Sequence, residues 1–228
     1  MKVVPGTLYI VSTPIGNLSD LSFRAIDTLK SVDLVAVEDS RVTGKLFKNY
    51  NIKNKFFIYN NFNENRRYLD LLEKLIDGID IALVSDAGTP NISDPGYKII
   101  SESRKSGVNI VSIPGPCSVV AALSISGLPA NRFFYEGFLP KKKGRKKRFE
   151  FLSLVDSTIV ILESPLRVNK TLNDILNFMG NRIVALCKEI TKIHENVKFG
   201  YVNDIINEEN MKYKGEYIIL IANEKHEL

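Results

Sequence analysis

The segment with the most evident chemistry runs from Ser85 to Gly96 and contains two Gly, two Pro and two Asp. It follows an apolar run at residues 79–84, as a loop follows the C-terminal end of a buried strand. Gly and Pro at this density predict tight turns, and small residues let the backbone approach a ligand closely. We expect a ligand-binding loop in which Asp86 accepts hydrogen bonds from hydroxyl or amino groups. Asp94 and Pro95 are better explained as the N-cap and first turn of the next helix.

Two further Gly/Pro turns follow predicted strands, at residues 13–18 and at 114–116. The first lacks the GxGxxG spacing of a nicotinamide site, and Gly44-Lys45 lacks the flanking residues of a nucleotide triphosphate loop. Because the carboxyl ends of parallel strands meet at one edge of a sheet, three such turns would surround one crevice. This convergence indicates a binding site for a small polar ligand.

Adjacent carboxylates occupy positions 38 and 39, two residues before Arg41 and directly after the predicted strand at residues 32–37. Such a cluster suits reaction chemistry or the orientation of a substrate. A helix N-cap at Asp39 with a first-turn salt bridge to Arg41 explains the same residues equally well. Both interpretations stay open at the level of sequence.

A polycationic loop is expected between residues 141 and 148. Its seven cations exceed the net charge of +5, so the rest of the chain is net negative. Concentrated positive charge is typical of a phosphate-binding surface, although a solvated linker is the simpler alternative. The cations are Lys141, Lys142, Lys143, Arg145, Lys146, Lys147 and Arg148.

The composition bears on three properties of the protein: disulfide bonds, metal binding and location in the cell. Cys117 and Cys187 are too few for a disulfide framework, and neither they nor His194 and His226 have the spacing of a metal site, so no metal is expected. No apolar run is long enough to cross a bilayer, and residues 1–11 do not have the core of a signal peptide. We therefore expect a cytoplasmic protein.

Alternating strands and helices predict an α/β fold with two domains, residues 1–114 with a parallel sheet and residues 115–228 with a mixed sheet, separated by a cleft. Helical spacing predicts core-facing side chains in two helices of the first domain. These are Phe23, Ile26 and Leu29 for the helix of residues 22–30, and Leu69, Leu72 and either Leu75 or the following Ile76 for the helix of residues 64–75.

The motifs together resemble the ribosomal RNA small subunit methyltransferase I family, the RNA-acting branch of the tetrapyrrole methylases. The resemblance covers nearly the whole chain in order, from Thr13-Pro14-Ile15-Gly16-Asn17-Leu18 to Lys214-Gly215-Glu216. It also includes Glu38-Asp39-Ser40-Arg41, Ser85-Asp86-Ala87-Gly88-Thr89-Pro90, Pro114-Gly115-Pro116-Cys117, Tyr135-Glu136-Gly137-Phe138-Leu139-Pro140 and Lys188-Glu189 with Thr191-Lys192. The small-molecule branch usually has Gly-Asp-Pro where this chain has Ser85-Asp86-Ala87, which favours RNA over a porphyrin or corrin precursor.

The resemblance implies a homodimer that uses S-adenosylmethionine to methylate the 2′-oxygen of a cytidine in the decoding region of 16S ribosomal RNA, free or within the 30S subunit. By analogy, residues of both domains would contact the methyl donor. These are Ile15, Asp86, Gly88, Thr89, Cys117, Ser118, Leu162, Cys187 and Tyr217. Arg41 would hold a phosphate or a carboxylate, Asn17 would orient the ribose, and the basic loop would bind the RNA backbone.

A ribose hydroxyl is a poor nucleophile at neutral pH, so a carboxylate or amine at a strand end is a candidate to take its proton. In the alternative, positioning alone suffices. Two other functions compete: methylation of a tetrapyrrole precursor, and RNA binding without catalysis. The candidate catalytic residues are Glu38, Asp39, Glu163, Lys188 and Glu189.

Overall fold

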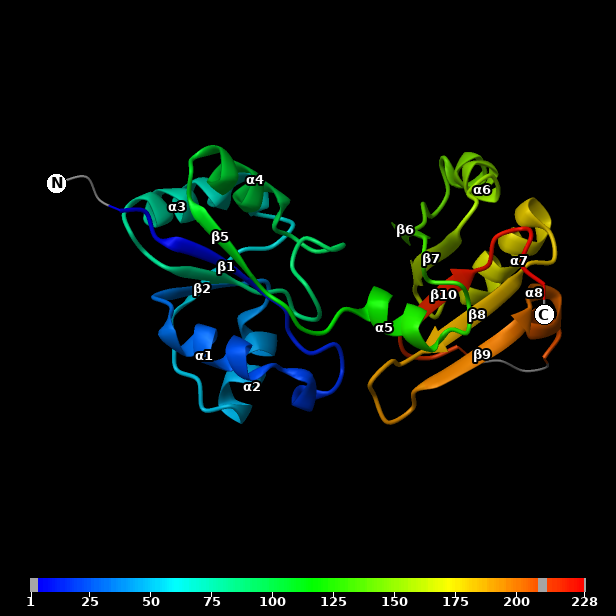
Figure 1. Ribbon diagram of the computed structural model, residues 1–228, viewed down its shortest axis with the longest axis horizontal. Coiled ribbons are helices and arrows are strands. Elements are labelled where there is room, and N and C mark those ends of the chain that lie inside the picture. The colour runs from blue at the N-terminus through cyan, green and yellow to red at the C-terminus, as the bar shows by residue number, and fades with distance from the viewer. Residues whose placement is uncertain (1–3, 209–212, 228) are drawn as a thin grey trace. The chain divides into compact units, whose positions relative to one another are not determined.

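A computed structural model describes residues 4–208 and 213–227 of the chain. The chain divides into two compact units, Met1–Cys117 (unit 1) and Ser118–Leu228 (unit 2). Each unit is built on one five-stranded sheet with helices, so the predicted α/β class is confirmed (Figure 1). Sequence places the boundary between residues 114 and 115, a few positions before the junction of these units.

Unit 1 has an all-parallel sheet in the order β3-β2-β4-β1-β5. The strands are β1 (Thr7–Val11), β2 (Leu34–Val37), β3 (Phe56–Ile58), β4 (Ile81–Leu83) and β5 (Asn109–Ile113). A short 3₁₀ helix, η1 (Leu18–Asp20), precedes four helices, α1 (Phe23–Ser31), α2 (Ser40–Asn49), α3 (Glu64–Ile76) and α4 (Tyr97–Lys105). Since every strand is parallel, the loops that follow the strands all lie at one edge of the sheet.

Helices cover both faces of this sheet (Figure 1). On one face, Leu29 of α1 and Phe47 of α2 pack with Val35 and Val37. On the other face, α3 and α4 pack on residues that alternate with these along the strands, including Leu8, Ala36, Ile81 and Leu83. Fully apolar strands of this kind are expected in a parallel sheet that is buried on both sides.

Two of the predicted core positions are wrong: Phe23 is 88% exposed and Leu69 is 56% exposed. At the end of α3, Leu75 is buried and its alternative Ile76 is 45% exposed. The faces of α1 and α3 that are buried are centred on Ala25 and Leu71, which sequence spacing alone did not select. The buried residues are Ala25, Thr28 and Leu29 in α1, and Leu71 and Leu75 in α3.

Unit 2 has the mixed sheet that sequence predicts, in the order β6-β7-β10-β8-β9. The strands are β6 (Phe133–Phe138), β7 (Thr158–Glu163), β8 (Ile183–Lys188), β9 (Asn196–Tyr201) and β10 (Tyr217–Ile221), and only β6 and β7 pair in parallel. Its helices are α5 (Ser118–Ile125), α6 (Arg145–Ser153), α7 (Val168–Met179) and α8 (Val202–Asn207). The core contains side chains of α6, α7 and α8 together with Ile161, Leu186 and Ile219 of the sheet. Among the described residues, no helix has both the length and the apolar character needed to cross a membrane.

Two local predictions require correction. The N-cap of α4 is Gly96, at φ 146°, and not Asp94, because the chain makes a further turn before the helix begins. The expected basic loop is a loop only to Gly144: α6 begins at Arg145, so four of its seven cations are helical.

Candidate functional site

The turns after β1 and β4 are joined by a short two-way hydrogen-bonded bridge at the carboxyl edge of unit 1. Thr13 N donates to Gly88 O at 2.9 Å, and Gly88 N donates to Thr13 O at 3.1 Å. The Thr13 hydroxyl donates to Ser85 O at 3.0 Å. The two turns therefore hold each other in place.

The turn after β5 joins the same cluster through Thr89. Its hydroxyl lies 2.8 Å from Ser12 Oγ and donates to Pro116 O at 3.3 Å. A Cβ on Gly115 would lie 3.1 Å from Ser12 Cβ, so glycine permits this close approach. The predicted convergence of three turns is thus present within unit 1.

Three carboxylates meet at this edge, from Glu38, Asp86 and Asp94. Burial raises the pKa of each above its usual value, and the nearby charge of Asp86 raises the pKa of Glu38 and of Asp94 further. Asp86 Oδ1 accepts a hydrogen bond from Asp39 N at 3.1 Å, which fixes the carboxylate against the end of β2. Asp94, predicted from the sequence to be a helix cap, belongs instead to this group of carboxylates. Its position at the end of the same loop was the one sequence signal for this placement.

Asp39 has the helix-capping role, which was one of the two roles that the sequence left open. It is the N-cap of α2, and its carboxylate accepts from Arg41 N at 2.8 Å. The Arg41 guanidinium donates to both carboxylate oxygens, and these hydrogen bonds lower the pKa of Asp39 to about 2. Asn17 similarly caps η1, where it accepts from Ser19 N at 3.1 Å.

Glu163 lies inside unit 2 in a buried polar network. Its carboxylate accepts hydrogen bonds from Ser164 N at 2.8 Å and the Thr171 hydroxyl at 2.6 Å, and Arg167 Nη2 lies 2.7 Å from Oε1. The side chain has no exposed surface. Glu163 therefore has a structural role between β7 and α7, because both of its carboxylate oxygens face protein donors.

Three residues of unit 2 that were expected to contact the methyl donor lie on the sheet of this unit. Two of them are on one face and the third is on the other. Leu162 and Cys187 both pair with Ile218, so these three side chains share a face. Tyr217 precedes Ile218 and its ring packs in the core with the helices, 5.5 Å from the ring of Tyr213. The Tyr217 side chain therefore points away from Leu162 and Cys187. Burial raises the pKa of the Cys187 thiol to about 12.

Glu189 is held at the end of β8 by a compact set of contacts. Burial favours its neutral form, but donation from Lys192 Nζ at 2.9 Å and Glu216 N at 2.8 Å lowers its pKa below the usual value. A Cβ on Gly215 would lie 2.5 Å from Glu189 Cδ. Lys188 is half-buried at the same strand end.

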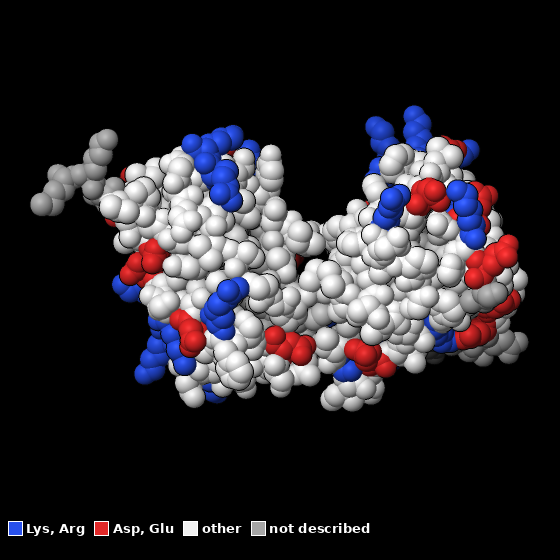
Figure 2. Space-filling model, in the orientation of Figure 1, with Lys and Arg blue, Asp and Glu red and all other residues white. Residues whose placement is uncertain are grey.

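The basic segment contains cations of two kinds. Arg145 is 5% exposed; its Nε lies 2.7 Å from Asp174 Oδ2, and Nη2 donates to the Thr171 hydroxyl at 2.7 Å. Arg148 donates to both carboxylate oxygens of Glu136. The lysines are exposed, and Figure 2 shows cationic side chains standing at the end of unit 2 that carries α6. The arginines support the fold, and the lysines Lys141, Lys142, Lys143, Lys146 and Lys147 form the available charge.

The remaining expected site residues are in or beside these turns. Ile15 is half-buried, with Cγ2 3.4 Å from a Cβ built on Gly88. Cys117 and Ser118 are also half-buried, at the end of unit 1 and the start of unit 2. Within residues 4–208 and 213–227, no three His, Cys, Asp or Glu side chains are grouped to hold a metal ion.

Comparison with known proteins first defines the class of protein. Residues 7–206 match the family model of the tetrapyrrole (corrin/porphyrin) methylases. The fold is similar to that of a diphthine synthase, with a TM-score of 0.77 at 14% identity over 97% of this chain and 92% of that chain. It is also similar to a uroporphyrin-III-C-methyltransferase from Thermus thermophilus, with a TM-score of 0.66 at 20% identity over 95% and 94%.

Curated relatives identify the branch. The protein named ribosomal RNA small subunit methyltransferase I from Vibrio cholerae is 46% identical over 96% of this chain and 79% of its own length. The protein of the same name from Thermotoga maritima is 40% identical over 95% of this chain and 98% of its own length. The chain belongs to the ribosomal RNA small subunit methyltransferase I family of the tetrapyrrole methylases.

Proposed function

We propose that this chain transfers a methyl group from S-adenosylmethionine to the 2′-oxygen of a cytidine in the decoding region of 16S ribosomal RNA. The observation that carries the proposal is the 46% identity, over 96% of the chain, to a protein named for methylation of small-subunit ribosomal RNA. An RNA of the small ribosomal subunit, free or assembled, is then the partner, and the cytoplasm is the compartment. We also propose that the chain acts as a homodimer.

The chemistry of the residues present fits this donor. Its positive sulfonium and amino groups favour nearby carboxylates, and Asp86 lies in a group of three. Gly88, at φ 86°, keeps its surface open beside Ile15, where an added Cβ would be in contact. We assign donor binding to Ile15, Asp86, Gly88, Thr89 and Cys117 of unit 1, and to Ser118, Leu162, Cys187 and the backbone of Tyr217 in unit 2.

S-adenosylmethionine, when bound, supplies an electrophilic methyl group. The chain must then hold the ribose hydroxyl and receive its proton. Among the five candidate residues, Glu38 is the carboxylate best suited to this task, because burial and Asp86 raise its pKa and make it a stronger base. Asp39 is a weaker base, since Arg41 lowers its pKa, and Glu163 is engaged within unit 2. Glu189 is likewise engaged with Lys192, while Lys188 remains a second candidate.

Single-turnover methyl transfer tests the assignment of Glu38. Glu38→Gln should lower the rate at saturating donor and RNA by about 100-fold, the usual contribution of a positioned base. The matched control is Glu73→Gln, which changes an exposed carboxylate on α3. A loss smaller than tenfold would exclude Glu38 as the base and leave positioning as the explanation.

The function itself is tested by mapping labelled methyl groups. The protein is incubated with labelled donor and either 30S subunits, naked 16S RNA or a tetrapyrrole precursor. We expect label on a ribose of the RNA and none on the precursor. Label on the precursor would support small-molecule methylation, which the fold of the Thermus enzyme also serves. RNA binding without donor binding would indicate a non-catalytic module.

A further inference from the structure

We propose that the turn between β3 and α3 is a stacking platform for an unpaired RNA base. Phe62 would contact the base, and Arg66 would contact an adjacent phosphate. This inference rests on the proposed action on ribosomal RNA. It adds a second RNA-binding surface, on unit 1, to the lysines of unit 2.

Phe62 is the most exposed large apolar side chain of the described residues, at 99%. Leaving a Phe side chain in water forgoes the stabilisation that its burial gives. Single exposed apolar residues are common, so exposure alone does not define a site. The conformation of the turn and its neighbours is what distinguishes Phe62.

The turn is rigid because asparagine side chains close it internally. Asn60 N donates to Asn63 Oδ1 at 2.9 Å, and Phe62 N donates to Asn60 Oδ1 at 3.1 Å. Asn63 Nδ2 donates to Ile58 O at 3.3 Å, which ties the turn to the end of β3. Phe62 is therefore displayed on an ordered turn, and binding requires little further ordering of the backbone.

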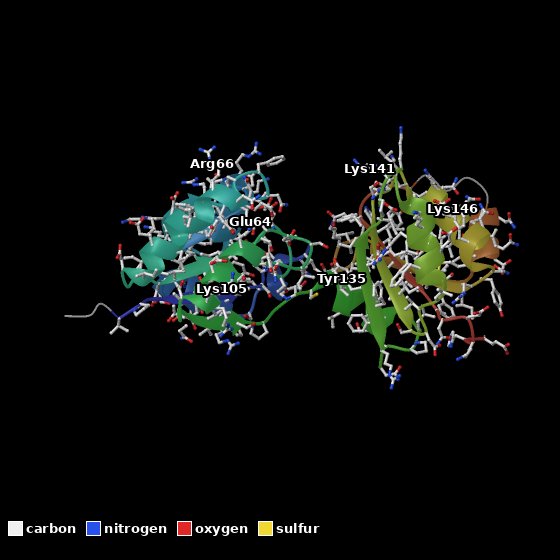
Figure 3. All side chains as sticks on the ribbon, turned by 90° about the horizontal axis from the view of Figure 1, so that it is seen from above. Glu64, Arg66, Lys105, Tyr135, Lys141 and Lys146 are labelled. Atoms are coloured by element: carbon white, nitrogen blue, oxygen red, sulfur yellow. The ribbon has the colours of Figure 1, made fainter. Side chains whose placement is uncertain are left out.

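The side chains beside Phe62 are polar and exposed. Asn61, Asn65 and Arg66 are exposed, and no ion pair joins Arg66 to another described residue. Arg67, by contrast, is occupied: it donates to Ile58 O at 3.0 Å and lies 4.0 Å from the centroid of the Phe57 ring. Figure 3 shows Arg66 projecting outward from α3. The platform thus combines one aromatic ring, amide groups and an available cation.

The platform is connected to the loop of residues 85–96 through Glu64. This residue begins α3, and its Oε1 accepts from Gly96 N at 2.9 Å and Lys98 N at 3.2 Å, at the start of α4. Tyr59 Oη donates to the same oxygen at 3.0 Å. A base held by Phe62 would therefore have a fixed position relative to the loop that contains Asp86.

Single-stranded RNA is the partner that this chemistry favours. Unpaired bases stack on aromatic side chains, and their edges bond with amides, whereas a base inside a duplex exposes no face. A protein partner would require a contiguous apolar surface, but the residues next to Phe62 in the sequence are asparagines, and Asn65 and Arg66 follow in the first turn of α3. Arg66 adds attraction for the phosphate next to the stacked base.

Fluorescence tests the stacking directly, because the chain contains no Trp. Phe62→Trp creates a single reporter on the turn. We expect quenching on addition of a single-stranded oligoribonucleotide of about eight nucleotides, and little quenching with a duplex of the same composition. The matched control is Phe23→Trp, at another exposed Phe of unit 1, on a helix that covers the opposite face of the sheet. Equal quenching at both positions, or none at position 62, would overturn the proposal.

Methyl-transfer kinetics test whether the platform contributes to binding of the RNA substrate. Phe62→Ala should raise KM for RNA about tenfold, the effect of losing roughly 1.4 kcal/mol, without changing donor affinity. Phe62→Tyr should restore KM, because it retains the ring. Arg66→Ala should reduce the slope of log affinity against log salt by about one. A weakened donor affinity or a failure of Tyr to restore KM would refute RNA stacking. If naked RNA and assembled subunits are both methylated, an effect on KM for the subunits alone would also refute it and would point to a ribosomal protein.

The quenching experiment needs neither donor nor methyl transfer. If the wild-type chain transfers no methyl group to RNA yet the quenching occurs as expected, the proposed activity fails and the platform stands. If transfer occurs and no quenching is seen, only the platform fails.

Discussion

Glu64 Oε1 and Gly96 N are 2.9 Å apart, so a carboxylate at the start of one helix caps the start of another. Gly96 has no side chain to cap α4 itself, and the negative charge of Glu64 suits the positive end of the helix dipole. The same contact closes the loop of residues 85–96. Glu64 thus links α3 both to the loop and to the start of α4.

Replacing Glu64 should therefore destabilise the chain. Glu64→Ala leaves two backbone N–H groups without an acceptor, which should cost about 1–3 kcal/mol in urea denaturation. Glu64→Gln should lose less, because its amide oxygen still accepts. The exposed Glu73→Ala on the same helix is the control and should be nearly neutral. Equal effects of Glu64→Ala and Glu73→Ala would contradict the capping role.

Donor affinity should depend on pH. The pKa values of Glu38, Asp86 and Asp94 are raised, so these groups gain protons at a higher pH than ordinary carboxyls as the solution is acidified. Protonation removes negative charge that attracts a cationic donor. Equilibrium dialysis should show weaker binding as pH falls from neutrality, beginning above the ordinary carboxyl range, and Asp86→Asn should flatten the curve. A profile that is identical in Asp86→Asn would count against a role for this carboxylate.

The raised pKa values of Glu38, Asp86 and Asp94 also affect the stability of the fold. A carboxyl with a raised pKa in the folded state destabilises the fold when it is ionised, and this penalty disappears as pH falls through the folded-state pKa. Asp39 affects stability in the opposite direction. Its folded-state pKa is depressed to about 2, so the ionised carboxylate stabilises the fold above the unfolded-state pKa. This stabilisation is lost as the pH falls toward the folded-state pKa. Asp86→Asn should therefore raise the denaturation midpoint at pH 7 and change it little in acid.

Substitutions should distinguish the two kinds of cation in the basic segment: those of the lysines should affect RNA binding, and that of Arg145 should affect stability. Changing Lys141, Lys142, Lys143 and Lys147 together to Ala should reduce the salt slope of RNA binding by roughly three, since each phosphate contact on a single strand contributes about 0.7. Stability should be unaffected, because these side chains are exposed. Arg145→Ala should instead destabilise the fold by about 3–5 kcal/mol, because it leaves Asp174 unpaired in a largely buried network. An unchanged salt slope in the lysine variant would remove these residues from the RNA surface.

Two glycine substitutions should change the free energy of unfolding in opposite directions. Gly215→Ala places a Cβ against Glu189 at φ 89°, and should destabilise by about 1–3 kcal/mol. Gly44→Ala, inside α2 with no atom within 4 Å of the added carbon, should stabilise by about 0.5–1 kcal/mol. Chemical denaturation of both variants checks the pair, and a neutral Gly215→Ala would show that Glu189 has another position available.

The sequence predicted the sheets well because fully apolar strands and Gly/Pro turns are local signals. The turn cluster at Thr13, Gly88 and Thr89 followed from chain order in a parallel sheet. What local pattern could not predict were pairings between distant residues. Nothing near Arg145 in the sequence indicates Asp174 and Thr171 as its partners, 29 and 26 positions away, or distinguishes it from the lysines beside it.

The parallel pairing of β6 with β7 has a consequence for how the basic segment can change. The backbone entering this crossover is clamped at Leu139 and Pro140, whose carbonyls accept from Arg167 and Arg145. The next fixed point is Arg145 itself, at the start of α6. Between these anchors the lysine turn is exposed and free of the core, so residues can be inserted there without disturbing either anchor. The length of this turn would then set how far positive charge extends from a scaffold that stays the same.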